Sequence, residues 1–336
     1  MKRILAYGLF FCLFLFFCGC SDTSAEPVTA PLEPTAVPAA TAVPTATPEP
    51  TPEPTPEPTP EPLNFSVDPH KLPADQKAFL ENAQALGDFD VLMDAVSLRE
   101  TKITCTDSAS AKAAAEVFAS TPYSACAALT VEDRQILFTY DDAASPDELH
   151  AAVCTMVQET VLQSNTPLER MMKLYRTVSG FEYTENESNN LCRTLLTKAG
   201  GPKELASALQ FLFTQADIPA WLAEGKAGTM THYWVIAEYN GTLYHFDPVF
   251  ENGTTAGRGL SYFGMSDQAH QDAGCTADYC TGFPQFKQKA NDLCADPRFD
   301  DPFTAVTDWT LDENTHTLTL TYNFDPTAQI EIAITE

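Results

Sequence analysis

The chain has 336 residues and is strongly acidic, with 46 Asp and Glu against 19 Lys and Arg, a formal net charge of -27 and a pI of about 4.4. This balance excludes nucleic acid as a partner, because a polyanionic phosphate backbone is bound by basic surfaces. The acidity indicates a soluble, exported protein and names no substrate.

The first twenty residues set the compartment. Lys2 and Arg3 precede an apolar run from Ile4 to Phe17, which predicts a secretory signal. Small residues before Cys20 are typical of a bacterial lipoprotein signal, in which that cysteine becomes the lipidated first residue. We therefore expect a signal peptide over 1–20 and a cell-surface protein held by lipid on the outer face of the cytoplasmic membrane. An ordinary cleaved signal and an uncleaved anchor helix are alternatives, although the run is shorter than the roughly 20 residues of a spanning helix.

Residues 21–63 predict a disordered stalk rich in Pro, Thr and Glu. The segment has no Lys or Arg, and four copies of Thr-Pro-Glu-Pro fill Thr47 to Pro62. Because proline fixes φ and the glutamates repel one another, an extended polyproline II conformation is expected, with a reach of roughly 130 Å at about 3.1 Å per residue. The simplest role is a spacer, and a ligand for proline-binding modules is the alternative.

Residues 64–143 are expected to form a small α/β module without catalytic features. The pattern predicts helical stretches between Ala74 and Leu98 and an alanine-rich helix over 108–120. Short strands are expected at 102–106, 123–129 and 134–140.

The main domain, expected over 144–300, begins with helices. Ser145-Pro146-Asp147-Glu148 offers a capping box with proline at the first helical position, and Thr166-Pro167-Leu168-Glu169 repeats this start signal. A third helix opens at Gly200-Gly201-Pro202. Its apolar face has helical spacing and consists of Leu205, Ala208, Leu209 and Leu212.

Strands follow the third helix. The segments 220–225, 232–239 and 242–246 are β-prone, and Asn240-Gly241 is a strong hairpin signal between the last two. The sequence thus predicts an α+β architecture, in which a central helix packs on an antiparallel sheet. Residues 301–336 are expected to add two or three β-strands as a C-terminal appendage.

Two polar residues of this sheet are candidates for chemistry. His232 and Trp234 alternate along one strand, so their side chains share a face. Asp247 ends the next strand, at nearly the same distance from the turn as His232. We therefore expect His232 and Asp247 to be cross-strand neighbours.

The ordered set of Gly-Gly helix start, Ala-rich helix, Ile-Pro strand, His-x-Trp, Asn-Gly turn and Phe-Asp-Pro resembles the transglutaminase-like branch of the papain-like fold. The resemblance covers about Leu168 to Asp267. It implies a papain-like core with the catalytic groups Cys, His and Asp in that order. His232 and Asp247 match the second and third, while Pro202 falls on the nucleophile. Tyr233 and Trp234 are expected in the core or lining the cleft.

The proline decides the functional hypothesis. Cysteine acyl transfer needs a thiolate, an imidazole and an orienting carboxylate, and proline supplies no nucleophile. Proline is nevertheless favoured at the first turn of a helix, so the fold loses nothing. The leading hypothesis is a catalytically degenerate, cofactor-free module that binds extracellular protein, peptide or cell-wall polymer. The alternatives are a cysteine protease or transglutaminase-type enzyme that uses Cys192 with His232 and Asp247, and a purely structural head on the stalk.

Seven cysteines remain beyond the signal region, and in an exported protein their default state is the disulfide. Expected local pairs are Cys105 with Cys126, and Cys280 with Cys275 or Cys294. A zinc cluster of His270, Cys275, Cys280 and Cys294 can also be drawn. No Cys-x-x-Cys spacing supports it, so no metal is expected.

Overall fold

The computed structural model describes residues 67–140, 144–161, 166–185, 190–280, 294–325 and 329–333. The predicted signal peptide, the lipidation site Cys20 and the predicted stalk lie outside these ranges. Thr59–Glu336 belong to one compact unit. Within the described ranges, every helix is too short or too polar to cross a membrane.

The N-terminal module combines three helices with a small antiparallel sheet. The helices are α1 (Ala74–Asn82), α2 (Leu86–Ser97) and α3 (Ser108–Ser120). The sheet has the order β1-β3-β2, with β1 at Lys102–Thr104, β2 at Ala128–Glu132 and β3 at Gln135–Thr139. The bounds of α3 are those predicted, because Asp107 and Ser110 form a capping box.

One predicted strand of this module is wrong except for its last two residues. Where a strand over 123–129 was expected, the chain forms a 3-10 turn, η1 (Pro122–Ala125), and only then enters β2. The physical reason is Pro122, whose fixed φ suits the first position of a helical turn.

Helices α4 (Pro146–Val161) and α5 (Pro167–Ser179) begin at the predicted prolines. In α5 the predicted capping box is present, because Thr166 and Glu169 each accept a hydrogen bond from the backbone N–H of the other. The connection to the central helix carries α6 (Leu191–Thr197), with the short parallel strands β4 (Glu182–Tyr183) and β5 (Ala199–Gly200) on either side of it.

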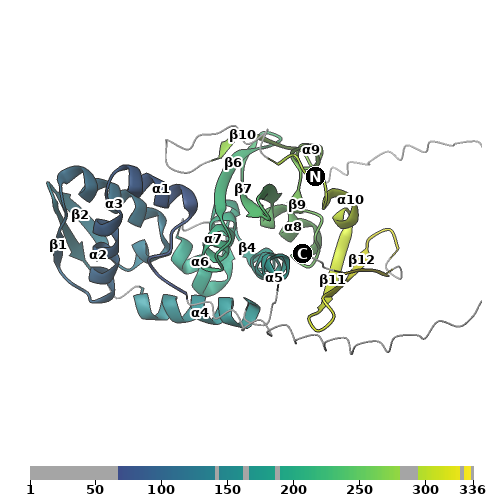
Figure 1. Ribbon diagram of the computed structural model, residues 1–336, viewed down its shortest axis with the longest axis horizontal. Helices are drawn as coiled ribbons and strands as arrows, with labels where there is room; N and C mark the ends of the chain where they lie inside the picture. The colour runs from purple at the N-terminus through teal and green to yellow at the C-terminus, as the bar shows by residue number, and fades with distance from the viewer. Residues whose placement is uncertain are drawn as a thin grey trace, which may run out of the picture. The chain divides into compact units, whose positions relative to one another are not determined.

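The central helix, α7 (Pro202–Gln215), starts where the sequence predicts. Gly201 is its N-cap and Pro202 its first residue. The four residues predicted for its apolar face are all fully buried: Leu205, Ala208, Leu209 and Leu212. Helix α7 packs against strands β6 (Ala220–Ala227) and β7 (Met230–Tyr239), as Figure 1 shows in its central part.

The sheet beside α7 is antiparallel throughout, in the order β10-β6-β7-β8-β9. Its other strands are β8 (Thr242–Phe246), β9 (Phe263–Met265) and β10 (Cys275–Cys280). Asn240 and Gly241 form the predicted turn, with φ of 49° and 76°, so the left-handed conformation falls on residues that tolerate it. The predicted α+β class, with a central helix on an antiparallel sheet, is confirmed.

Two short helices connect the outer strands, α8 (Pro248–Thr255) between β8 and β9 and α9 (Asp267–Asp272) between β9 and β10. The chain then continues through α10 (Asp300–Phe303) into a three-stranded antiparallel sheet of β11 (Val306–Asp312), β12 (Thr317–Tyr322) and β13 (Gln329–Ala333). The predicted C-terminal strands are therefore present. Arg176 of α5 holds this sheet through Asp308, at 2.6 Å.

Candidate functional site

His232 and Asp247 meet, but not as directly opposed residues. In the register of β7 and β8, Val235 pairs with Phe246, so one further step places Asp247 beside Trp234. Asp247 lies just beyond β8 and is the N-cap of α8. Its side chain therefore reaches His232 diagonally, which corrects the expectation of a direct cross-strand pair.

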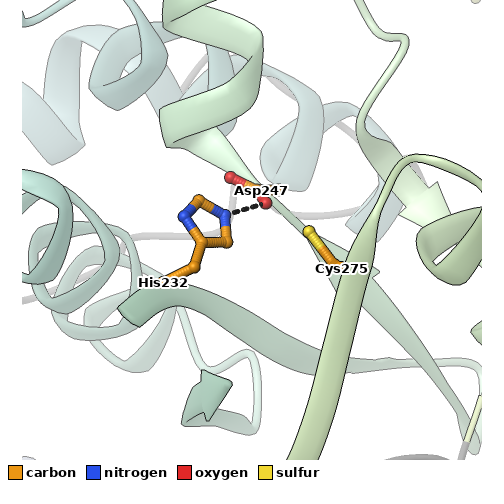
Figure 2. Close-up of side chains that lie close together, drawn as sticks. All are labelled: His232, Asp247 and Cys275. Atoms are coloured by element: carbon orange, nitrogen blue, oxygen red, sulfur yellow. Dashed lines mark hydrogen bonds and ion pairs between the residues drawn. The ribbon is translucent and has the colours of Figure 1, made fainter. Parts of the chain in front are cut away.

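The contact between the two side chains is short and buried. His232 Nε2 lies 2.5 Å from Asp247 Oδ2, the dashed contact in Figure 2, and Asp247 is fully buried. Asp247 Oδ1 accepts the backbone N–H groups of Val249 and Phe250, at 3.1 and 2.9 Å. Burial alone would raise the pKa of Asp247, but His232 and His270 outweigh it and hold that pKa well below its usual value. The carboxylate is therefore ionised and fixed in orientation.

A second set of hydrogen bonds fixes the backbone at Asp247. The Tyr175 hydroxyl lies 3.0 Å from the Asp247 carbonyl, to which it donates, and 3.2 Å from Glu251 Oε2. Glu251 in turn accepts the backbone N–H of Tyr262 at 2.9 Å. Helix α5 thus braces the start of α8, and with it the carboxylate that orients His232.

The resemblance found in the sequence assigns the expected nucleophile to the first residue of α7. Pro202 occupies it and has neither a reactive side chain nor a backbone N–H. Lys203, the next residue, has its Nζ 5.8 Å from the centre of the Tyr233 ring. Since Tyr233 follows His232 on β7, the start of the helix lies next to the histidine strand.

Cys192, considered as a replacement nucleophile, lies elsewhere. It is buried on α6, where a hydrogen bond with Cys126 of the N-terminal module lowers the pKa of its thiol. The structure therefore joins Cys192 to Cys126 and not to His232. The expected Cys105–Cys126 disulfide is not formed in this structure.

A different cysteine approaches the pair. The Sγ of Cys275, at the start of β10, lies within 4.8 Å of a ring nitrogen of His232 and of a carboxylate oxygen of Asp247. Burial, and then the Asp247 charge, raise the pKa of Cys275. Figure 2 places the thiol on the Asp247 side of the imidazole, with the other ring nitrogen of His232 pointing away from it. Cys275 is thus a protonated thiol facing a nitrogen already engaged by a carboxylate, which is a poor arrangement for nucleophilic attack.

Trp234 belongs to a second buried cluster instead of a cleft wall. Its Nε1–H donates to His245 Nδ1 at 2.9 Å, and His245 Nε2 lies 2.8 Å from Asp267 Oδ1. Asp267 Oδ2 accepts the backbone N–H of Cys294 at 3.0 Å. Burial lowers the pKa of His245 to about 4, so this imidazole is neutral at physiological pH. His245, Asp267 and Cys294 form a second group of three potential metal donors.

Tyr233, in contrast, borders a cavity of about 700 Å³ at the start of α7. Lys203 and Glu204 of α7 line the same cavity, as do Leu222 and Glu224 of β6. Residues of α1, α3 and α6 also line it. The cavity therefore presents both charged and aromatic side chains along one side of the central helix.

Sequence reasoning missed three members of these clusters as site residues: His245, His270 and Cys275. A signal existed for His245, because strand alternation sets it on the same face of the chain as Asp247, two residues later. His270 and Cys275 come from α9 and β10, and their spacing in the sequence gives no hint that they approach the strands of the pair.

No protein-family model and no curated protein matches the chain. A candidate cysteine protease from Cytophaga hutchinsonii is similar at 18% identity and a TM-score of 0.27, over 30% of this chain and 37% of that one. A candidate protease from Parabacteroides distasonis aligns at 13% and 0.24, over 35% of each chain. The periplasmic domain of TgpA from Pseudomonas aeruginosa aligns at 16% and 0.26, over 38% and 57%. The chain spans less than two thirds of each of these structures.

Proposed function

We propose that this chain is a cell-surface lipoprotein whose transglutaminase-like domain no longer catalyses acyl transfer and instead binds extracellular peptide or cell-wall polymer. The observation that carries the proposal is Pro202 at the first position of α7, beside an intact His232–Asp247 pair. The pair retains the base and its orienting carboxylate, while the group that would form the acyl intermediate is missing.

The arrangement of the other thiols supports the loss of catalysis. Cys192 is buried against Cys126, and Cys275 is buried and protonated on the Asp247 side of the ring. A thiol activated by imidazole needs access to substrate and a ring nitrogen free to take its proton. Neither cysteine meets both requirements.

The cavity at the start of α7 is the proposed binding site. Tyr233 offers an aromatic face, while Lys203 and Glu224 offer charges of both signs. Such a mixture suits a peptide or a wall fragment that carries both amines and carboxylates. The predicted lipid on Cys20 and the predicted stalk would hold this site within reach of the wall.

Catalysis is tested with the purified full-length chain, with a peptide amide as substrate and a small alkylating agent as thiol probe at mildly acidic pH. We expect no thioester and no rapidly reacting cysteine. A Pro202→Cys variant should gain a fast-reacting thiol that is lost in Pro202→Cys/His232→Ala. Lys203→Cys, one residue further along the same helix, is the matched control and should react slowly. A thioester on the unmodified chain would refute the proposal.

Binding is tested with a panel of wall muropeptides and unrelated peptides, by titration of the same full-length chain. Tyr233→Ala should weaken binding at least about tenfold, since stacking of an aromatic ring and its excluded water are lost. Phe324→Ala removes an exposed aromatic ring that does not line the cavity and should have no effect. Binding that is absent for the whole panel, or equal in the Tyr233→Ala variant, contradicts the binding role.

A further inference from the structure

We infer that the retained His–Asp pair is part of a zinc site, formed by His232, Asp247 and Cys275, with His270 as the fourth ligand. This inference goes beyond the proposed binding function and is independent of it, since a metal on these residues requires no ligand in the cavity beside α7.

Three donor atoms of this group already lie together. A ring nitrogen of His232, a carboxylate oxygen of Asp247 and Cys275 Sγ are all within 4.8 Å of one another, and all three residues are buried. They come from β7, from the start of α8 and from β10, so three separate elements converge on one point (Figure 2).

His270 supplies an independent observation. Its Nε2 lies 3.8 Å from Asp247 Oδ2, which is longer than a hydrogen bond. This atom is buried without a hydrogen-bond partner among the described residues, and the whole side chain is only 2% exposed. A buried polar atom without a partner is costly, and coordination to a metal beside Asp247 would satisfy it.

The donor set suits zinc. Imidazole, carboxylate and thiolate are the ligands that Zn²⁺ takes in closed tetrahedral sites. On binding, the Cys275 thiol releases its proton to solvent, and the proton in the His232 Nε2–Asp247 contact is displaced as well, to solvent or to Nδ1, so that His232 keeps one proton, on Nδ1. One thiolate and one carboxylate then balance the two positive charges of the ion, so the buried site is neutral overall.

At His232 and Asp247 the geometry requires only a local adjustment, whereas the His270 ring lies outside the group of donors within 4.8 Å of one another and has to move toward it. Zinc bound at about 2.0–2.2 Å from both nitrogen and oxygen separates these two atoms by about 3.3 Å, against 2.5 Å between His232 Nε2 and Asp247 Oδ2. The metal takes the place of the proton in that contact. The Val249 and Phe250 amides on Asp247 Oδ1 would orient the carboxylate as a ligand, as outer hydrogen bonds do in metal sites.

The second group of potential metal donors, His245, Asp267 and Cys294, has no such unsatisfied nitrogen or oxygen in its side chains. In His245 and Asp267 both ring nitrogens and both carboxylate oxygens already have hydrogen-bond partners at 2.8–3.0 Å. No atom of these two side chains is left to be satisfied by an ion. The difference makes Cys294, in this second group, a matched control for Cys275.

The test measures zinc by mass spectrometry after the full-length chain is loaded with ZnCl₂ and desalted, with cobalt as a spectroscopic substitute. We expect one zinc per chain, a rise in melting temperature with zinc, and a thiolate-to-cobalt charge-transfer band. Cys275→Ser should abolish the band and weaken zinc binding at least about tenfold, while His270→Gln weakens it without removing the band. Cys294→Ser should behave like the unmodified chain.

Two outcomes overturn the inference: no zinc retained by the unmodified chain, or equal loss in the Cys275→Ser and Cys294→Ser variants. Far-UV circular dichroism checks that the variants are folded. If Cys275→Ser does not fold, the test instead compares alkylation rates in the unmodified chain with and without zinc. Zinc should then slow alkylation of Cys275 and leave that of Cys105 unchanged, and an unchanged rate at Cys275 overturns the inference. The peptide-binding and acyl-transfer assays are run in chelator, which leaves His232 free of metal, so either proposal can fail alone.

Discussion

Two buried clusters on the same sheet are built from the same three residue types, and they differ in how completely their polar atoms are used. In the cluster of His245, Asp267 and Cys294, each ring nitrogen and carboxylate oxygen has a partner. In the cluster of His232, Asp247 and Cys275, the neighbouring His270 Nε2 has none among the described residues. Residue types alone therefore do not distinguish the two clusters, whereas the distribution of unsatisfied atoms does.

The largest expected effect comes from removing the Asp247 carboxylate from the cluster of His232, Asp247 and Cys275. Asp247→Ala takes away the acceptor of two backbone amides, the N-cap of α8 and the partner of His232 at once. We expect a loss of about 3–5 kcal/mol in the free energy of unfolding, measured by urea denaturation. Asp247→Asn keeps an acceptor for the amides and should lose less. A loss below about 1 kcal/mol would show that this cluster is not held by Asp247.

The cluster of His245, Asp267 and Cys294 should lose stability in acid. The pKa of His245 is about 4 in the folded chain against a usual 6.5, so the unfolded chain binds more protons between these values. Stability contributed by His245 is therefore present above pH 6.5 and lost as pH falls toward 4, by about 3 kcal/mol. Urea denaturation in chelator across this range measures it. His245→Gln should flatten the curve, and an unchanged slope in that variant contradicts the assignment.

A smaller effect is expected at the donor that fixes His245. Trp234→Phe keeps the ring packing but removes the Nε1–H, and it leaves His245 Nδ1 buried without this donor. The expected loss is about 1–3 kcal/mol in the free energy of unfolding. Trp309→Phe is a control, because Trp309 is also buried but its Nε1 has no hydrogen-bond partner among the described residues. Equal losses of stability in Trp234→Phe and Trp309→Phe would show that the hydrogen bond from Trp234 to His245 does not stabilise the fold.

The smallest effect is expected for the unsatisfied atom itself. In chelator-treated protein, His270→Phe replaces an imidazole whose Nε2 has no hydrogen-bond partner within the described ranges. The free energy of unfolding should change by about 1 kcal/mol or less, because an apolar ring of similar shape leaves nothing unpaired at that position. A loss of stability as large as that of Trp234→Phe would mean that the polar atoms of the two clusters are equally engaged in hydrogen bonds.

Much of this arrangement could be predicted from local sequence. Capping signals located the starts of α4 and α5, Pro202 located the start of α7, and the Asn-Gly turn located the hairpin that leads from His232 to Asp247. Alternation along β7 predicted that His232 and Trp234 share a face. These short-range rules work because caps and turns depend on neighbours in the chain.

The remainder could not be predicted because it depends on the path of the chain after β9. Cys275 reaches Asp247 only because β10 joins the far edge of the sheet beside β6, a pairing without local signal. Asp247 was expected opposite His232 because its role as the cap of α8 was not recognised. The contact of Cys192 with Cys126 likewise joins segments that no periodicity relates.

Under the proposed function, Pro202 also bears on how acyl-transfer chemistry would be lost. At the first turn of a helix, backbone N–H groups point outward and can bind a developing oxyanion. Proline removes the amide at that position as well as the side chain. In the proposed function, a single residue would thus account for the absence of both the attacking atom and one potential donor for the tetrahedral intermediate. Because the same residue fits the helix without strain, selection for folding exerts no pressure to restore it, although reversal needs only one amino-acid replacement.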